Sequence, residues 1–142
     1  MNMKTIPADW WKAFHRPATP QEWEDLTFPS FRKNLKNIPE FPVAVGYRIR
    51  PYRNRKDRQH WAAIWQAASI RGWDWATPEG FDKDYGRDQN VLRKRVLFAE
   101  TVKGEPVGTV AAWYGRQRGK RWGMIHWYAV VPKHQGHGLG KS

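Results

Sequence analysis

The chain has 142 residues, no cysteine and a formal net charge of +12. Its length and its 40% hydrophobic content fit one folded domain with a modest core and exclude a wholly disordered chain. Because cysteine is absent, disulfides, thiolate metal sites and a cysteine acyl-enzyme intermediate are excluded as well.

The excess of Lys and Arg favours an anionic partner, although a charged, solvated surface accounts for it equally well. No apolar run approaches the ~20 residues that a membrane-spanning helix needs, and residues 1–14 lack the apolar stretch of a signal peptide. We therefore expect a soluble, cytoplasmic protein with no membrane partner.

Residues 1–42 predict an N-terminal extension, because they are rich in proline and show no sustained periodicity. One short helix is expected within it: Thr19 can cap the helix, Pro20 suits its first position and Glu22 completes a capping box. The folded domain is expected to occupy residues 43–142.

Apolar and polar residues alternate over residues 43–50, which is the period of a half-buried strand. The next segment predicts a helix that Asp57 caps and that ends near Gly72. Its apolar residues fall on one face at helical spacing: Trp61, Ile64, Trp65 and Ala68. A further short helix is expected within residues 73–94, where Thr77 and Pro78 mark a start.

Three strands are predicted in the second half of the chain. Two turns join them, at residues 103–106 and 115–121, and both carry Gly and charge. The strands occupy residues 95–102, 107–114 and 122–131. Connections this short make the three strands an antiparallel meander.

A glycine-rich loop follows the last strand, with Gly136, Gly138 and Gly140 at every second position. Glycines let the backbone approach a ligand closely, and consecutive N–H groups near a helix start form an anion-binding nest suited to a pyrophosphate. A Walker A loop would need glycine where Gln135 stands, and a Rossmann fingerprint would need it at Lys141, so neither nucleotide motif fits.

The sequence Val-Val-Pro (residues 130–132) followed by Gln-Gly-His-Gly-Leu-Gly (residues 135–140) resembles the acetyl-CoA signature of the GNAT superfamily of N-acetyltransferases. The segment LFAETVKGEPVGTVAAW, residues 97–113, is similar to a hairpin of the same family. The resemblance covers residues 43–142. It implies an α/β (α+β) fold in which a first strand and helices precede the meander. Since the chain stops at the first turn of the helix after the loop, we expect the N-terminal part of the domain, with its C-terminal half missing.

The resemblance also implies acetyl-CoA as cosubstrate, an unidentified amine as acceptor, direct transfer in a ternary complex and no metal. Val130 and Val131 would pair with the pantetheine arm, and Lys141 and Ser142 would stand at the first turn of the helix. The residues that would wrap the pyrophosphate are Gln135, Gly136, His137, Gly138, Leu139 and Gly140.

His126 is the candidate catalytic residue. An alkyl ammonium has a pKa near ~10, so a base or a water chain must remove a proton from the amine before acetylation. His126 lies on the strand that leads into the loop, and its position resembles that of the strand histidine proposed as general base in arylalkylamine N-acetyltransferases. Alternation predicts that Met124, His126, Tyr128 and Val130 share one face. The alternatives are a structural histidine paired within the sheet and, as a reserve catalytic group, Glu100.

Two other functions stay open at this stage. The basic residues between Arg48 and Arg58, with Trp61 close behind, are compatible with a nucleic-acid-binding module. A catalytically inactive CoA-binding fragment is the second alternative, because the tyrosine that serves as general acid in the family would lie beyond Ser142. A homodimer is compatible with either function.

Overall fold

The computed structural model describes residues 35–68, 74–117 and 120–142. The helix expected after Thr19 and the helix end expected at Gly72 lie outside these residues. The chain divides into two compact units, residues 1–38 and residues 39–142, and the second contains every described helix and strand. None of the described helices has the length and apolar character needed to cross a membrane.

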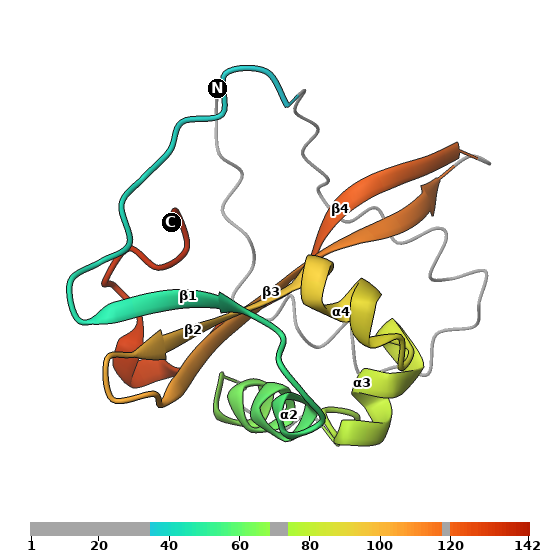
Figure 1. Ribbon diagram of the computed structural model, residues 1–142, viewed down its shortest axis with the longest axis horizontal. Helices are drawn as coiled ribbons and strands as arrows, with labels where there is room; N and C mark the ends of the chain where they lie inside the picture. The colour runs from blue at the N-terminus through green and yellow to red at the C-terminus, as the bar shows by residue number, and fades with distance from the viewer. Residues whose placement is uncertain (1–34, 69–73, 118–119) are drawn as a thin grey trace, which may run out of the picture. The chain divides into compact units, whose positions relative to one another are not determined.

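Four antiparallel strands form one sheet in the order β1-β2-β3-β4 (Figure 1). The strands are β1 (Tyr47–Pro51), β2 (Val96–Thr101), β3 (Pro106–Gln117) and β4 (Lys120–Val130). The predicted meander is confirmed, although β3 and β4 extend into the segment expected to be a turn. The first strand starts later than predicted, because Gly46 adopts a φ of 90° and the Tyr47 N–H donates to the Ala44 carbonyl in a turn.

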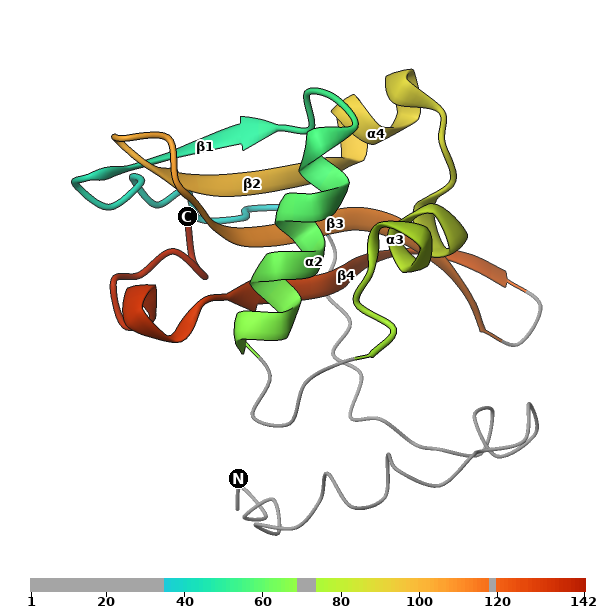
Figure 2. The ribbon, with the colours of Figure 1, turned by 90° about the horizontal axis from the view of Figure 1, so that it is seen from below.

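Three helices lie on one face of the sheet: α2 (Lys56–Ala68), α3 (Pro78–Tyr85) and α4 (Gln89–Arg95) (Figure 2). Thr77 caps α3 as predicted, since its hydroxyl accepts from the Gly80 N–H at 3.0 Å. The predicted cap at Asp57 is wrong. The side-chain oxygen at the start of α2 belongs to Asn54, which accepts from the Lys56 N–H at 2.9 Å. Helix α4, capped by Asp88, was not predicted.

The main core lies between the helices and the sheet and is largely aromatic, with Trp61, Phe81 and Phe98 almost fully buried. A second, smaller cluster forms where the glycine-rich loop meets the sheet. It consists of Ala99, Val107, Val130 and Leu139. Leu139 therefore anchors the loop to the strands.

A buried network of charges joins β1, β2 and α2. The Arg50 guanidinium, 6% exposed, donates to both Asp57 oxygens at 2.7 and 2.8 Å and also bonds Glu100. Arg48 and Arg53 contact the same Glu100 carboxylate at 2.9 and 3.5 Å. Burial acts to raise the pKa of Glu100, but hydrogen bonds from Arg50 and Arg48 and the positive charge of Arg53 outweigh it and hold that pKa below its usual range.

Candidate functional site

Strand β4 contains a bulge just before the glycine-rich loop. Thr109 pairs with Ala129 whereas Ala111 pairs with His126, so Trp127 and Tyr128 together stand opposite the single residue between Thr109 and Ala111. Trp127 has a φ of 49°, in the left-handed region that a bulky residue rarely occupies. Such an extra residue interrupts the pairing and re-aims the side chains that follow it.

The bulge changes which side chains share a face of β4. Strict alternation predicted His126 and Trp127 on opposite faces, and this prediction is wrong. Both rings face the helices, with centroids 5.1 Å apart, and the Trp127 ring contacts those of Trp65 and Trp75 at 5.2 and 4.5 Å. Tyr128 contacts Gly140 of the loop instead. The extra residue shifts the two-residue period by one position.

His126 is paired with a buried tyrosine that the sequence did not indicate. Its Nδ1 lies 3.2 Å from the hydroxyl of Tyr85, at the end of α3. Burial lowers the pKa of His126, and the Asp84 carboxylate opposes this shift only in part. The imidazole is therefore mainly neutral at neutral pH. The only available signal for Tyr85 was its spacing from Phe81, which places both rings on one face of a helix that begins at Thr77.

The glycine-rich loop begins after a short 3-10 turn, Pro132–His134. Gly136 and Gly138 have φ values of 79° and 80°, which glycine adopts without strain. Among the residues that the structure describes, the backbone N–H groups of residues 136–140 have no hydrogen-bond acceptor. The expected first turn of a helix is not formed: residues 139–141 make a turn in which the Lys141 N–H donates to the Gly138 carbonyl at 3.1 Å.

Contacts with strands β4 and β1 hold the loop in place. The Gln135 amide donates to the Val130 carbonyl at 2.8 Å, and the Tyr47 hydroxyl of β1 lies 2.8 Å from His134 Nδ1. A Cβ at Gly140 would come within 2.5 Å of the Tyr128 hydroxyl, so no other residue fits there without displacing that ring. The loop is thus anchored at both ends, while its middle amides stay unpaired.

The two valines expected to face a pantetheine arm already make internal hydrogen bonds. The Val131 N–H donates to the Val107 carbonyl at 2.9 Å, and the Val131 carbonyl accepts from the His134 N–H at 3.0 Å. The Val130 carbonyl accepts from Gln135. Each carbonyl keeps a second lone pair, so a ligand would meet acceptors rather than free N–H donors at Val131.

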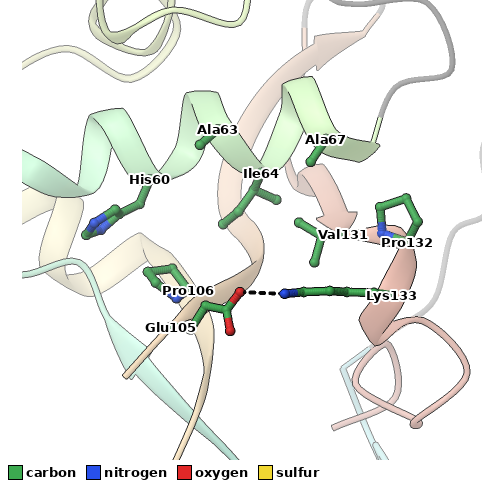
Figure 3. A pocket seen from close by; sticks show the side chains of 9 residues that line it. All are labelled: His60, Ala63, Ile64, Ala67, Glu105, Pro106, Val131, Pro132 and Lys133. Carbon is green, nitrogen blue, oxygen red and sulfur yellow. Dashed lines mark hydrogen bonds and ion pairs between the residues drawn. The ribbon is translucent and has the colours of Figure 1, made fainter. Parts of the chain in front are cut away.

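A groove of about 550 Å³ lies between α2 and the end of β4 (Figure 3). Its lining includes Ile64 and Val131, and an ion pair of 2.9 Å between Lys133 and Glu105 crosses its rim. Of the residues expected to bind the cosubstrate, only Val131 lines this groove. The groove and the glycine-rich loop are therefore separate features. Within the described ranges, no group of three or more His, Asp or Glu is placed to hold a metal ion.

Several solved structures resemble the chain, including the following three. A glucosamine N-acetyltransferase region of a fungal multi-domain β-N-acetylglucosaminidase is 27% identical, with a TM-score of 0.49 over 74% of this chain and 12% of that one. A Pyrococcus horikoshii protein assigned as an acetyltransferase is 23% identical, with a TM-score of 0.49 over 80% of this chain and 34% of that one. Another protein of that organism is 21% identical, with a TM-score of 0.46 over 67% of this chain and 64% of that one. The chain thus spans less than two thirds of each. No curated protein matches its sequence significantly.

The model of the acetyltransferase (GNAT) family matches residues 61–142, from the first turns of α2 to the end of the loop. This match covers more than half of the chain and includes the bulged strand and the unpaired amides described above. It confirms the resemblance seen in the sequence and the expected fold of helices on an antiparallel sheet. The chain belongs to the GNAT acetyltransferase family.

Proposed function

We propose that residues 39–142 bind acetyl-CoA at the glycine-rich loop and transfer its acetyl group directly to an amine in a ternary complex. The observation that carries this proposal is the run of unpaired N–H groups over residues 136–140. Family membership supports acyl transfer from acetyl-CoA as the reaction class. The amine, the order of binding and the residue roles belong to the proposal.

In this proposal the residues Gln135 to Gly140 wrap the pyrophosphate. Left-handed glycines turn successive N–H groups toward one point, and a doubly charged anion there would satisfy several donors at once. Lys141 adds a positive charge next to the loop. The Ser142 hydroxyl donates to the Gly138 carbonyl at 3.2 Å and so holds the end of the loop against its middle. The amides need little rearrangement to bind, since the anchored loop already holds them.

The pantetheine arm would leave the loop along Val130 and Val131 and run toward the bulge at Trp127. Its amide N–H groups would donate to the free lone pairs of the valine carbonyls. The thioester would then lie near His126, the proposed catalytic residue. The neutral amine nitrogen would attack the thioester carbonyl carbon, and the C–S bond would break with its electron pair leaving on the CoA sulfur. The surplus proton on the nitrogen would pass to solvent water.

A matched pair of glycine substitutions tests the pyrophosphate site. Gly136 and Gly86 have similar positive φ values, 79° and 73°, and a Cβ at either would meet open space. Ala costs about 1–3 kcal/mol of backbone strain at such a position. In calorimetric titrations, Gly136→Ala should therefore bind CoA at least tenfold more weakly than the wild type. Gly86→Ala should bind CoA with unchanged affinity. Equal affinities for both variants would refute the loop as the binding site.

The nucleic-acid alternative finds little support in the basic cluster, because most of it is paired internally. Arg50 is buried against Asp57, and Arg58 bonds Asp82 at 2.5 Å. Phosphate-driven binding weakens steeply with salt. Salt-sensitive DNA binding without any affinity for CoA would favour that alternative, and CoA binding without turnover would identify a catalytically inactive chain.

A further inference from the structure

The hydrogen bond between Tyr85 and His126 places the two nitrogens of the imidazole ring in different surroundings. Tyr85 is 5% exposed, and its hydroxyl lies 3.2 Å from His126 Nδ1. On the other side of the ring, Nε2 has no partner in the described part of the chain and is not among its fully buried polar atoms. The two ring nitrogens therefore differ, one facing the core and one facing out.

The buried hydroxyl of Tyr85 needs an acceptor for its hydrogen. The Trp61 ring packs edge-on against the Tyr85 ring, with centroids 6.2 Å apart, and its indole has no acceptor to offer. Among the described residues, the hydrogen-bond partner of the Tyr85 hydroxyl is His126 Nδ1. A buried donor left without an acceptor is costly, which favours the arrangement in which Tyr85 donates to Nδ1. Burial also raises the pKa of Tyr85, so the hydroxyl keeps its hydrogen.

A neutral imidazole that accepts at Nδ1 carries its single proton on Nε2. We propose that Tyr85 fixes neutral His126 in this tautomer, so that His126 donates a hydrogen bond from Nε2 to the reacting acyl group rather than accepting the amine's proton. Tyr85 is then a positioning residue, and its assignment to the reaction rests on the proposed function. The tautomer itself rests on the geometry alone.

The reaction step balances with this role. The lone pair of the neutral amine forms the new C–N bond, the carbonyl oxygen gains negative charge, and Nε2–H stabilises that charge without leaving the ring. The C–S bond then breaks, and its electron pair departs on the CoA thiolate. Solvent water takes up both protons that the nitrogen loses, one from the ammonium before the attack and one after the C–N bond has formed. Preorganised donors of this kind typically contribute about 10²–10³ in rate.

Protonation of His126 would conflict with the same contact. Both nitrogens of an imidazolium donate, so Nδ1–H would face a hydroxyl whose hydrogen then has no acceptor among the described residues. This loss favours the neutral ring, in the same direction as the burial that lowers the pKa of His126. The two effects together keep the ring neutral near pH 7.

Nitrogen NMR on uniformly ¹⁵N-labelled chain reads the tautomer without any ligand. The His126 signals are assigned by their loss in His126→Gln. We expect the protonated nitrogen to be Nε2 in the wild type and a mixture of tautomers in Tyr85→Phe, which keeps the ring and removes only the hydroxyl. Tyr114→Phe, an exposed tyrosine on β3, is the control and should match the wild type. A proton on Nδ1 in the wild type, or an unchanged tautomer in Tyr85→Phe, would overturn the proposal.

Kinetics then separate donor from base. Gln at position 126 still offers an N–H donor but cannot take up a proton, whereas Ala offers neither. A donor role predicts that His126→Gln stays within about tenfold of the wild-type kcat while His126→Ala loses about 10²–10³-fold. Equal losses in the two variants would refute the donor role. A chain with the expected tautomer but no affinity for acetyl-CoA would refute the proposed function and leave the effect of Tyr85 on the tautomer standing.

Discussion

Tyr47 and His134, 87 residues apart in the sequence, are joined by a hydrogen bond of 2.8 Å between the tyrosine hydroxyl and Nδ1 of the imidazole. The Tyr47 ring also packs against that of His137, with centroids 5.6 Å apart. The first strand therefore supports the glycine-rich loop directly. Tyr47 lies outside residues 61–142, the segment matched by the family model.

Loss of the hydrogen bond between Tyr47 and His134 should lower the affinity for CoA clearly while changing the unfolding free energy only slightly. Tyr47→Phe loses one hydrogen bond, worth about 0.5–1.5 kcal/mol of unfolding free energy. We expect CoA to bind several-fold more weakly, because the loop must then be ordered at the expense of binding free energy. S-acetylpantetheine, which lacks the pyrophosphate, should bind with unchanged affinity. An equal loss for both ligands, measured by calorimetry, would contradict a role confined to the loop.

The ion pair between Arg50 and Asp57 should be among the largest single contributors to stability. Asp57→Asn leaves the guanidinium of Arg50 buried with only Glu100 as a charged partner, and breaking a buried pair in this way costs about 3–5 kcal/mol. Glu79→Gln, an exposed acid on α3, serves as the matched control and should change the unfolding free energy by less than about 0.5 kcal/mol. Urea unfolding monitored by tryptophan fluorescence measures both. Similar values for the two variants would refute the importance of the pair.

The same network predicts how stability falls in acid. The pKa of Asp57 is held below its usual range, because hydrogen bonds from Arg50, the Arg53 N–H and His60 outweigh burial. A carboxylate whose pKa is lower in the folded state stabilises the fold fully above its unfolded pKa, about 3.9, and loses that contribution as pH falls through its folded pKa. The unfolding free energy should therefore drop below about pH 4 and drop less in Asp57→Asn. Parallel curves would contradict this assignment.

Helix α3 contains a glycine that packing requires. A Cβ at Gly80 would come within 2.1 Å of the Trp75 carbonyl oxygen, a backbone atom that cannot rotate away. Ala favours a helix over Gly by about 1 kcal/mol, but overpacking typically costs about 1–3 kcal/mol and should prevail here. We expect Gly80→Ala to be destabilising and to shift tryptophan fluorescence, since Trp75 packs on Trp127. Lys83→Ala, exposed on the same helix, should be nearly neutral.

His126 should also leave a signature in the pH dependence of stability. Its pKa is lower in the folded chain, so the unfolded chain binds more protons between that value and about 6.5. The stabilisation is complete above about pH 6.5 and falls as pH decreases toward the folded pKa. Asp84 and Tyr85 are the titratable groups that act on this imidazole. Stability curves from pH 7.5 to 5 should be flatter in His126→Gln; an unchanged slope would contradict a buried neutral imidazole.

Local patterns in the sequence predicted most of the fold. Alternation and short turns identified the meander, and the Thr77-Pro78 pair located the start of α3, because these features depend on neighbouring residues alone. Helix α4 escaped prediction because its seven residues give too few turns for a periodic signal. Its cap at Asp88, which accepts from the Asn90 and Val91 N–H groups, was the available clue.

The site was only partly predictable for a different reason. The loop could be identified because glycine spacing is itself a sequence signal. The bulge at Trp127 and the contacts of Tyr85 with His126 and Tyr47 with His134 depend on pairing between distant segments, which alternation within one strand does not reveal. The bulge therefore changed the side of β4 on which Trp127 and Tyr128 were predicted to lie. The glycine-rich loop follows the strand where the sequence predicted it.

The most direct test of the central claim is amide NMR of the ¹⁵N-labelled 142-residue chain during titration with CoA. A pyrophosphate bound by the loop predicts the largest shifts at the N–H groups of residues 136–140, with none there when S-acetylpantetheine replaces CoA. Binding of CoA that leaves these five amides unchanged, or no binding at all, would contradict the account.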